Sequence, residues 1–278
     1  MQEKAFAKIN LALHVRERAP DGYHRIETVF AFAEDGDRLE VEPSGALTLA
    51  SAGPFGAALP TGTDNLVLRA AEALRERFGV REGAALHLDK VLPPASGIGG
   101  GSADAAAALR LLDRFWRLDA GEEALMAIAA PLGADVPACL VSRSRRGTGK
   151  GERLEPIEDG PIRSMPLLLV NPGVPLSTAE VFAGWDRRDR GPLESKDAAE
   201  ALVRGRNDLE PSARRIVPAI GEVMERLAAC AGAVAVRMSG SGATCFALFR
   251  NAEERDSARA AIASEQPAWW QLATRIRS

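Results

Sequence analysis

The stretch Ser96-Gly97-Ile98-Gly99-Gly100-Gly101-Ser102 decides how the rest of the sequence is interpreted. Its four glycines allow backbone N–H groups to approach an anion without a Cβ in the way. The stretch follows a predicted strand, residues 85–91, and opens a predicted helix, residues 103–116, whose N-terminal dipole favours negative charge. Ser102 at the junction can cap the helix or contact a nucleotide-bound Mg²⁺. This context predicts a phosphate-binding loop rather than a flexible turn.

The loop fits none of the common nucleotide motifs. The Walker A loop requires Gly-x-x-x-x-Gly-Lys-Ser/Thr, and the dinucleotide fingerprint requires Gly-x-Gly-x-x-Gly. A second candidate, Gly147-Thr148-Gly149-Lys150-Gly151, also misses the Walker spacing. The His-Arg-Asp and Asp-Phe-Gly motifs of protein kinases are absent as well. A phosphate site of another class is therefore indicated.

The composition is that of an ordinary globular protein. The chain has 278 residues, of which 46% are hydrophobic and 26% charged, and this length favours two lobes that share a cleft. The 35 basic and 38 acidic residues give a net charge of -3. No global positive field exists to hold nucleic acid, so we expect no nucleic-acid partner and only local phosphate binding.

The cysteine content and the terminal segment indicate the compartment. Three scattered cysteines, Cys139, Cys230 and Cys245, form neither a disulfide framework nor a Cys-x-x-Cys metal knuckle. The N-terminal residues contain no apolar segment behind a basic start, and no run approaches the length of a membrane span. The sequence thus predicts a cytoplasmic protein without a membrane partner. It does not define an oligomeric state.

The order of expected elements mixes strands and helices. Apolar and polar residues alternate between residues 5 and 15, which predicts a strand with Lys8 and Asn10 on the same face. Residues 21–24 form a turn, and residues 156–161 are the best linker candidate. Further strands are predicted at 26–32, around 39–41, at 85–91, 166–170, 233–238 and 244–249 and near Leu272, and helices at 67–78, 103–116, 121–130, around 178–185 and 197–203, and at 216–229 and 252–262.

Three separated segments resemble, in order, the three motifs of the GHMP kinases, which include galactokinase, homoserine kinase and mevalonate kinase. They are Ala7-Lys8-Ile9-Asn10-Leu11, residues 93–103, and residues 238–246 (Met-Ser-Gly-Ser-Gly-Ala-Thr-Cys-Phe). Three others are similar to the GHMP subfamily that acts on a cytidylated methylerythritol: Asp21-Gly22-Tyr23-His24, Asp64-Asn65-Leu66 and Gly133-Ala134-Asp135-Val136-Pro137. Six motifs in the right order cover nearly the whole chain.

The resemblance implies an α+β fold of two lobes. Residues 1–157 would form an ATP-binding lobe that resembles the second domain of ribosomal protein S5. Residues 158–278 would form a ferredoxin-like lobe that closes the substrate cleft. The order of predicted elements is compatible with both lobes.

The resemblance also implies roles for individual residues. Asp135 would be the catalytic base and Lys8 its electrostatic partner. Asn10 would lie near the erythritol, Thr178 would line its pocket, and Tyr23, His24 and Phe182 would hold the cytidine. ATP with Mg²⁺ would supply the phosphoryl group, with no metal ligands assigned to the protein. The ATP phosphate site would comprise Pro93, Pro94, Ala95, Ser96, Gly97, Ile98, Gly99, Gly100, Gly101, Ser102 and Ala103.

Some positions depart from the family pattern or have structural interpretations. Ser96 stands for a small apolar residue and Ala103 for a second serine, but both positions can act through the backbone. Arg145 and Arg146 replace less charged residues and could tune phosphate affinity or be solvated. Asp135 has a structural alternative as a helix cap or turn carboxylate. Three further residues receive only structural interpretations: Asp104 as a charge that complements a helix N-terminus, and His14 and His87 as ordinary strand residues.

The leading hypothesis is phosphoryl transfer from ATP to the 2-hydroxyl of a cytidylated methylerythritol, a step of the non-mevalonate route to isoprenoid precursors. One alternative is a GHMP kinase for another small alcohol, such as homoserine or mevalonate. Another is a catalytically silent binding protein of the same fold, which the presence of both Lys8 and Asp135 disfavours.

Overall fold

The computed structural model describes residues 1–60, 62 and 64–277. The chain divides into two compact units. The first comprises residues 1–7, 35–94 and 99–142, and the second comprises residues 8–34, 95–98 and 143–278. This division differs from the boundary predicted after residue 157, which stays a prediction about the two family lobes. None of the helices in the described part of the chain combines the length and apolar character that a membrane span requires.

Strands β1 (Gln2–Arg18) and β2 (His24–Ser44) contribute residues to both units. The sequence predicts two strands, at residues 26–32 and around residues 39–41, where β2 runs without a break. Gly36 explains part of the continuity, since a Cβ at this position would overlap the carbonyl of Ala5. A glycine that suggests a turn in sequence therefore permits close strand packing in the fold.

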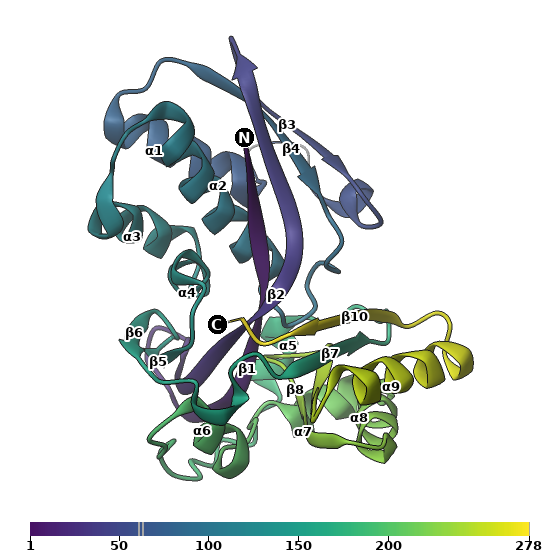
Figure 1. The fold of residues 1–278 in the computed structure, drawn as a ribbon. Coiled ribbons are helices and arrows are strands. Elements are labelled where there is room, and N and C mark those ends of the chain that lie inside the picture. The colour runs from purple at the N-terminus through teal and green to yellow at the C-terminus, as the bar shows by residue number, and fades with distance from the viewer. Residues whose placement is uncertain (61, 63, 278) are drawn as a thin grey trace. The chain divides into compact units, whose positions relative to one another are not determined.

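The sheet of the first unit has the order β3–β4–β2. Strand β3 (Leu47–Ala52) pairs in parallel with β4 (Gly83–Asp89), and β4 pairs antiparallel with residues 38–44 of β2. Figure 1 shows helices α1, α2 and α3 grouped on one side of these strands. The apolar side chains of the unit therefore gather between the helices and the sheet, as the buried Leu39, Leu86 and Leu88 show.

The α-helices of the first unit, in its described residues, are α1 (Leu66–Phe78), α2 (Gly100–Trp116), α3 (Gly121–Leu132) and α4 (Val136–Val141). Helix α1 follows from local signals, because the Asn65 side chain accepts a hydrogen bond from the N–H of Val67 at 2.9 Å and Gly79 ends the helix at φ 65°. Helix α2 packs against both α1 and α4. The short α4 was not predicted from the sequence, which indicates only a turn there.

The second unit contains two groups of paired strands. Residues 26–30 of β2 pair with β5 (Arg145–Gly149), which pairs with β6 (Arg153–Pro156). The other group is an antiparallel sheet of order β10–β7–β9–β8. Its strands are β7 (Pro166–Asn171), β8 (Ala233–Met238), β9 (Cys245–Phe249) and β10 (Trp270–Arg275).

Helices α8 (Ala219–Ala229) and α9 (Ala252–Glu265) lie side by side on one face of the four-stranded sheet (Figure 1). Val223 and Leu227 of α8 and Ile262 of α9 enter the same core as Leu168 and Phe249 of the sheet. The unit also contains α5 (Thr178–Ala183), α6 (Ala198–Arg204) and α7 (Glu210–Ile216). The sequence does not predict β5, β6 or α7 as separate elements.

Candidate active site

The predicted phosphate loop leads directly into helix α2. The helix begins at Gly100, three residues before the predicted start, after Gly99 in the left-handed conformation at φ 64°. The N–H of Ala103 donates to the carbonyl of Gly99 at 2.8 Å, which closes the first turn. The N–H groups of the first turn have no acceptor within the helix and are available to an anion.

A buried cluster of one lysine and two aspartates lies next to this helix start. The Nζ atom of Lys90 donates to Asp37 Oδ2 at 2.5 Å and to Asp104 Oδ2 at 2.6 Å. The side chains of Lys90 and Asp37 are 0% exposed and that of Asp104 is 3% exposed. A Cβ added at Gly100 would lie 3.0 Å from Lys90 Nζ. The interpretation of Asp104 as a charge that complements the helix N-terminus is therefore incomplete, because its carboxyl group also accepts a hydrogen bond from the buried Lys90.

The pKa values in this cluster predict a pH dependence of stability. Burial, opposed by Lys90 and reinforced by Asp37, raises the pKa of the Asp104 carboxyl from 3.8 to about 8. Between about pH 4 and pH 8 the Asp104 carboxyl is thus protonated to a greater extent in the folded chain than in the unfolded chain. We expect the contribution of Asp104 to the free energy of unfolding to fall as the pH rises through this interval.

Urea unfolding at pH values from 5 to about 9 measures this dependence when the native chain is compared with Asp104→Asn. The asparagine variant should lack the part of the decline that belongs to this carboxyl. Identical slopes of stability against pH in the two proteins would contradict the raised pKa.

The second unit holds Lys8 and Asn10 on one face of β1, as predicted. Lys8 Nζ donates to Asn10 Oδ1 at 2.8 Å and lies 5.5 Å from the centre of the Phe30 ring. Asn10 Nδ2 donates to Thr28 Oγ1 at 2.8 Å, and that hydroxyl donates to the carbonyl of Ala12 at 2.6 Å. This chain of hydrogen bonds fixes the Asn10 amide with its oxygen toward the ammonium. Lys8 is only 3% exposed, so its charge is held in a nearly desolvated position.

Asp135 lies at the N-terminal end of α4, in the first unit, and is half-buried. Its side chain makes no capping hydrogen bond to this helix, although its position is that of an N-cap. The alternative that Asp135 only caps the helix is therefore not supported. Because Lys8 and Asp135 lie in different units, the pairing expected between them stays a prediction.

The residues predicted to hold cytidine come together only in part. The rings of His24 and Phe182 have centroids 5.0 Å apart, and the edge of Trp185 packs against His24 at 5.7 Å. Tyr23 is 59% exposed, and its ring carries Lys150 Nζ at 3.5 Å from the centroid. Burial and the charge of Arg18 lower the pKa of His24, so its ring is neutral at pH 7.

Thr178 and the third motif meet through a hydrogen bond between the hydroxyls of Thr178 and Ser241, at 2.9 Å. The sequence analysis did not identify Trp185 or Lys150 as neighbours of the aromatic group. Trp185 follows Phe182 at helical spacing, so the sequence could have placed it beside Phe182. The approach of Lys150 to Tyr23 depends instead on the pairing of β5 with β2, which the sequence does not show.

Arg146, for which the sequence left two roles open, makes structural contacts. Its guanidinium donates to the carbonyls of Leu193 and Ser195, each at 2.6 Å.

Comparisons with known proteins identify the family of the chain. Residues 65–143 match the family model for the GHMP kinases N terminal domain, and residues 193–268 match the model for the GHMP kinases C terminal. A 4-diphosphocytidyl-2-C-methyl-D-erythritol kinase of Rhizorhabdus wittichii is 55% identical over 277 residues, which are 99% of this chain and 94% of that protein. One of Sphingopyxis alaskensis is 48% identical and covers 100% of this chain and 99% of that protein.

Solved structures give the same result. A crystal structure of 4-(cytidine 5'-diphospho)-2C-methyl-D-erythritol kinase matches with a TM-score of 0.84 and 35% identity over 100% of both chains. A homoserine kinase from Cytophaga hutchinsonii, at 17% identity and a TM-score of 0.72 over 98% of this chain and 95% of that one, shares the fold alone. The chain is therefore an ATP-dependent GHMP kinase and belongs to the family of the 4-diphosphocytidyl-2-C-methyl-D-erythritol kinases.

Proposed function

We propose that this enzyme transfers the γ-phosphoryl group of ATP to the 2-hydroxyl of 4-diphosphocytidyl-2-C-methyl-D-erythritol, as a step of non-mevalonate isoprenoid synthesis. The names of the full-length relatives support the substrate. The geometric observation that carries the assignment of phosphoryl transfer is the buried ammonium of Lys8, fixed by the Asn10 amide. A cation held this way stabilises negative charge at the reacting oxygens without reorganisation.

In the proposed mechanism Asp135 accepts the proton of the attacking hydroxyl. The hydroxyl oxygen forms a bond to the γ-phosphorus while the bond from that phosphorus to the β–γ bridging oxygen breaks, so ADP leaves. Lys8 neutralises charge at the attacking oxygen. Backbone N–H groups of Gly99, Gly100 and Gly101 stabilise the phosphates. Because the transition state is loose, positioning and charge stabilisation supply most of the rate.

We expect Mg²⁺ to enter with the phosphates of ATP. Over residues 1–60, 62 and 64–277 no cluster of three or more His, Cys, Asp or Glu side chains is suited to a metal ion. The hydroxyl of Ser102, in the first turn of α2, is the chain's candidate contact to the ion. The ion would screen the phosphate charges while the loop amides orient them.

For the cytosine ring we propose the aromatic group around His24. The neutral His24 ring can donate and accept hydrogen bonds, and Phe182 offers a face beside it. The proposed pocket also includes Tyr23, whose exposed ring carries Lys150 Nζ on one face and would stack on the base through the other. Asn10 and Thr178 would contact the erythritol.

The test of the proposed function is ADP release by the purified enzyme with a panel of alcohols. We expect turnover with 4-diphosphocytidyl-2-C-methyl-D-erythritol and little with homoserine or mevalonate. Preference for either of those alcohols would transfer the assignment to another GHMP kinase activity. Absence of ADP release with every alcohol would indicate a binding protein.

Substitution of the aromatic residues is expected to act on one substrate only. Tyr23→Ala and Phe182→Ala should each raise the KM for the cytidylated substrate by about five- to a hundred-and-fiftyfold, since base stacking on an aromatic ring is worth roughly 1–3 kcal/mol. The KM for ATP should change little. Steady-state kinetics with each substrate varied in turn measures both constants.

A matched control for these variants is Trp269→Ala, because Trp269 packs beside Arg226 rather than beside His24. It should leave both KM values near those of the native enzyme. An unchanged substrate KM in Tyr23→Ala, or an equal rise of the ATP KM, would place the cytidine pocket elsewhere.

We also propose a cytoplasmic location, which the few scattered cysteines support. The lobe boundary after residue 157 belongs to the same proposal, and it falls between the two matched family segments, residues 65–143 and 193–268.

A further inference from the structure

The segment Arg206-Asn207-Asp208, between α6 and α7, is attached to the strand that carries Lys8 and Asn10. The N–H of Leu13 donates to the carbonyl of Arg206 at 2.8 Å, and the N–H of Asp208 donates to the carbonyl of Leu13 at 2.9 Å. The Asp208 carboxylate also accepts from the N–H of Val15 at 2.8 Å. Two backbone hydrogen bonds and one to the Asp208 side chain thus attach this segment to β1.

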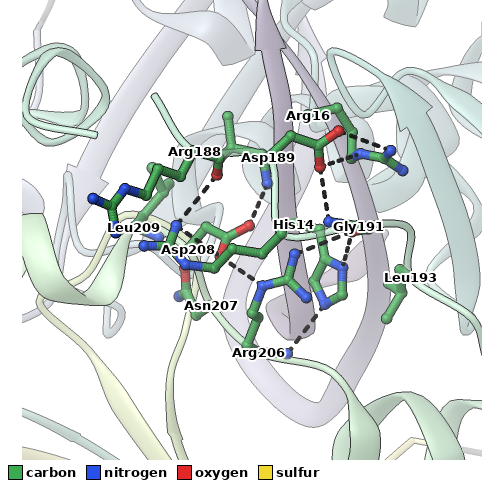
Figure 2. Close-up of polar contacts among 12 residues, drawn as sticks. His14, Arg16, Arg188, Asp189, Gly191, Leu193, Arg206, Asn207, Asp208 and Leu209 are labelled. Carbon is green, nitrogen blue, oxygen red and sulfur yellow. Dashed lines mark hydrogen bonds and ion pairs between the residues drawn. The ribbon is translucent and has the colours of Figure 1, made fainter. Parts of the chain in front are cut away.

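The flanking side chains strengthen this attachment, as Figure 2 shows. Arg206 Nε donates to Asp208 Oδ1 at 2.7 Å, and the other end of the guanidinium donates to the carbonyl of Gly191 at 3.1 Å. The His14 ring lies between Gly191 and Arg206, with Nδ1 3.2 Å from the Gly191 carbonyl and Nε2 accepting from the Arg206 N–H at 3.3 Å. Asn207 is therefore held in place on both sides.

The side chain of Asn207 contacts the end of β8 and the turn that follows it. It is 6% exposed, and Nδ2 donates to the carbonyls of Met238 and Gly240 at 2.9 and 2.8 Å. Its Oδ1 accepts from the N–H of Leu209 at 3.0 Å. A primary amide has two N–H donors, and both are used on carbonyls at the turn after β8. Aspartate has the same shape but lacks these donors.

This turn, residues 239–242, contacts the phosphate loop and Asn10. Ser239 Oγ accepts from the N–H of Asn10 at 3.2 Å and donates to the carbonyl of Gly97 at 2.9 Å. The N–H of Thr244 donates to the carbonyl of Ser96 at 3.1 Å. A Cβ at Gly240 would lie 2.9 Å from the Gly97 carbonyl oxygen, so the backbones are close-packed. A shift of the turn must therefore move its neighbours as well.

We propose that Asn207 is a positioning residue that clamps the turn 239–242 and, through Ser239, sets the positions of Asn10 and of residues 96–97 of the phosphate loop. Asn207 does not itself contact a substrate. The inference about the rate rests on the proposed function, whereas the clamp is a property of the second unit alone. A misplacement of about 1 Å at a phosphoryl-transfer site is enough to cost one to two orders of magnitude in rate.

The test is Asn207→Asp, which keeps the acceptor for Leu209 and places an oxygen against two carbonyls. We expect hydrogen exchange of the Ser239, Gly242 and Thr244 amides in the ligand-free enzyme to accelerate at least about tenfold. We expect kcat to fall about tenfold to thirtyfold, with a KM for the cytidylated substrate within about threefold of native. Asn207→Ser provides a second measurement when the aspartate variant does not fold, since its hydroxyl can still accept a hydrogen bond from the N–H of Leu209.

The matched control is Asn251→Ala, which removes a capping hydrogen bond to the N–H of Glu254 at the start of α9. It should lower stability without changing kcat or exchange in the turn. Unchanged exchange in the Asn207 variants would overturn the clamp, and accelerated exchange with native kcat would overturn the positioning role. If the native enzyme did not phosphorylate the cytidylated substrate, the proposed function would fail while the exchange measurement still decided the clamp.

Discussion

Asp135→Asn is expected to lower kcat about a hundredfold or more and to leave the affinity for ATP nearly unchanged. The substitution keeps the shape of the side chain but removes its basicity, and general base catalysis contributes roughly 10²- to 10⁴-fold. The Asp135 side chain does not cap α4, although it is placed to do so, so a capping role does not compete with this assignment. Steady-state kinetics and a nucleotide titration measure the two quantities.

Two further variants sharpen this test. Lys8→Ala should also lower kcat, and the double variant should fall far short of the product of the single effects, because the two groups act as a unit. Asp113→Asn is a suitable control, since Asp113 accepts a hydrogen bond from the N–H of Ala120 at 3.0 Å and has a local structural role. Near-native turnover of Asp135→Asn would remove Asp135 as the base.

Lys90→Met should lower the free energy of unfolding by about 3–5 kcal/mol, the cost of breaking a buried ion pair from one side. Methionine fills most of the volume of the lysine stem, so the loss arises mainly from charge. It leaves Asp37 and Asp104 together, with no exposed surface on Asp37 and almost none on Asp104. The two carboxyl groups must then share a proton or admit water.

Urea unfolding at pH 7 measures this loss, and Asp104→Asn is the matched variant. It retains Lys90 with Asp37 as a one-to-one pair and replaces a carboxyl whose raised pKa of about 8 already favours the neutral form. We expect it to change stability by less than about 1 kcal/mol at pH 7. A loss of similar size in both variants would show that the cluster does not depend on the charge of Lys90.

Elements with local signals were predicted well, and elements that depend on distant partners were not. Helix α1 has its cap, its apolar spacing and its terminal glycine within one segment, and its predicted range differs by a single residue. Strand β2 was predicted as two pieces, with Asp37 between them. In the fold Asp37 is buried and accepts from a lysine 53 residues away. A local sequence pattern does not reveal pairs of residues that lie this far apart along the chain.

The candidate site shows the same limit. The alternation in β1 was sufficient to place Lys8 and Asn10 on one face, and their side chains form a hydrogen bond. The roles of Lys90 and Asn207 were not predicted. A lone buried lysine resembles a surface residue in sequence, and the Asn207 amide meets carbonyls that lie 31 and 33 residues later. The family motifs identify groups that would contact substrate, and they do not identify the residues that support them.

The interleaving of the two units along the chain also affects how the protein can form on the ribosome. Residues 8–34 emerge early, but the strand β5 that pairs with β2 begins only at residue 145. The hydrogen bond from the N–H of Val15 can form only later still, because its acceptor Asp208 lies 193 residues further along the chain. During this interval the nascent chain exposes unpaired strand edges. Such edges can pair with other chains, and chaperones that cover them would prevent this aggregation. The strand that carries Lys8 is thus among the first parts of the enzyme to be translated, but its hydrogen bonds to residues 206–208 form only after most of the chain has been made.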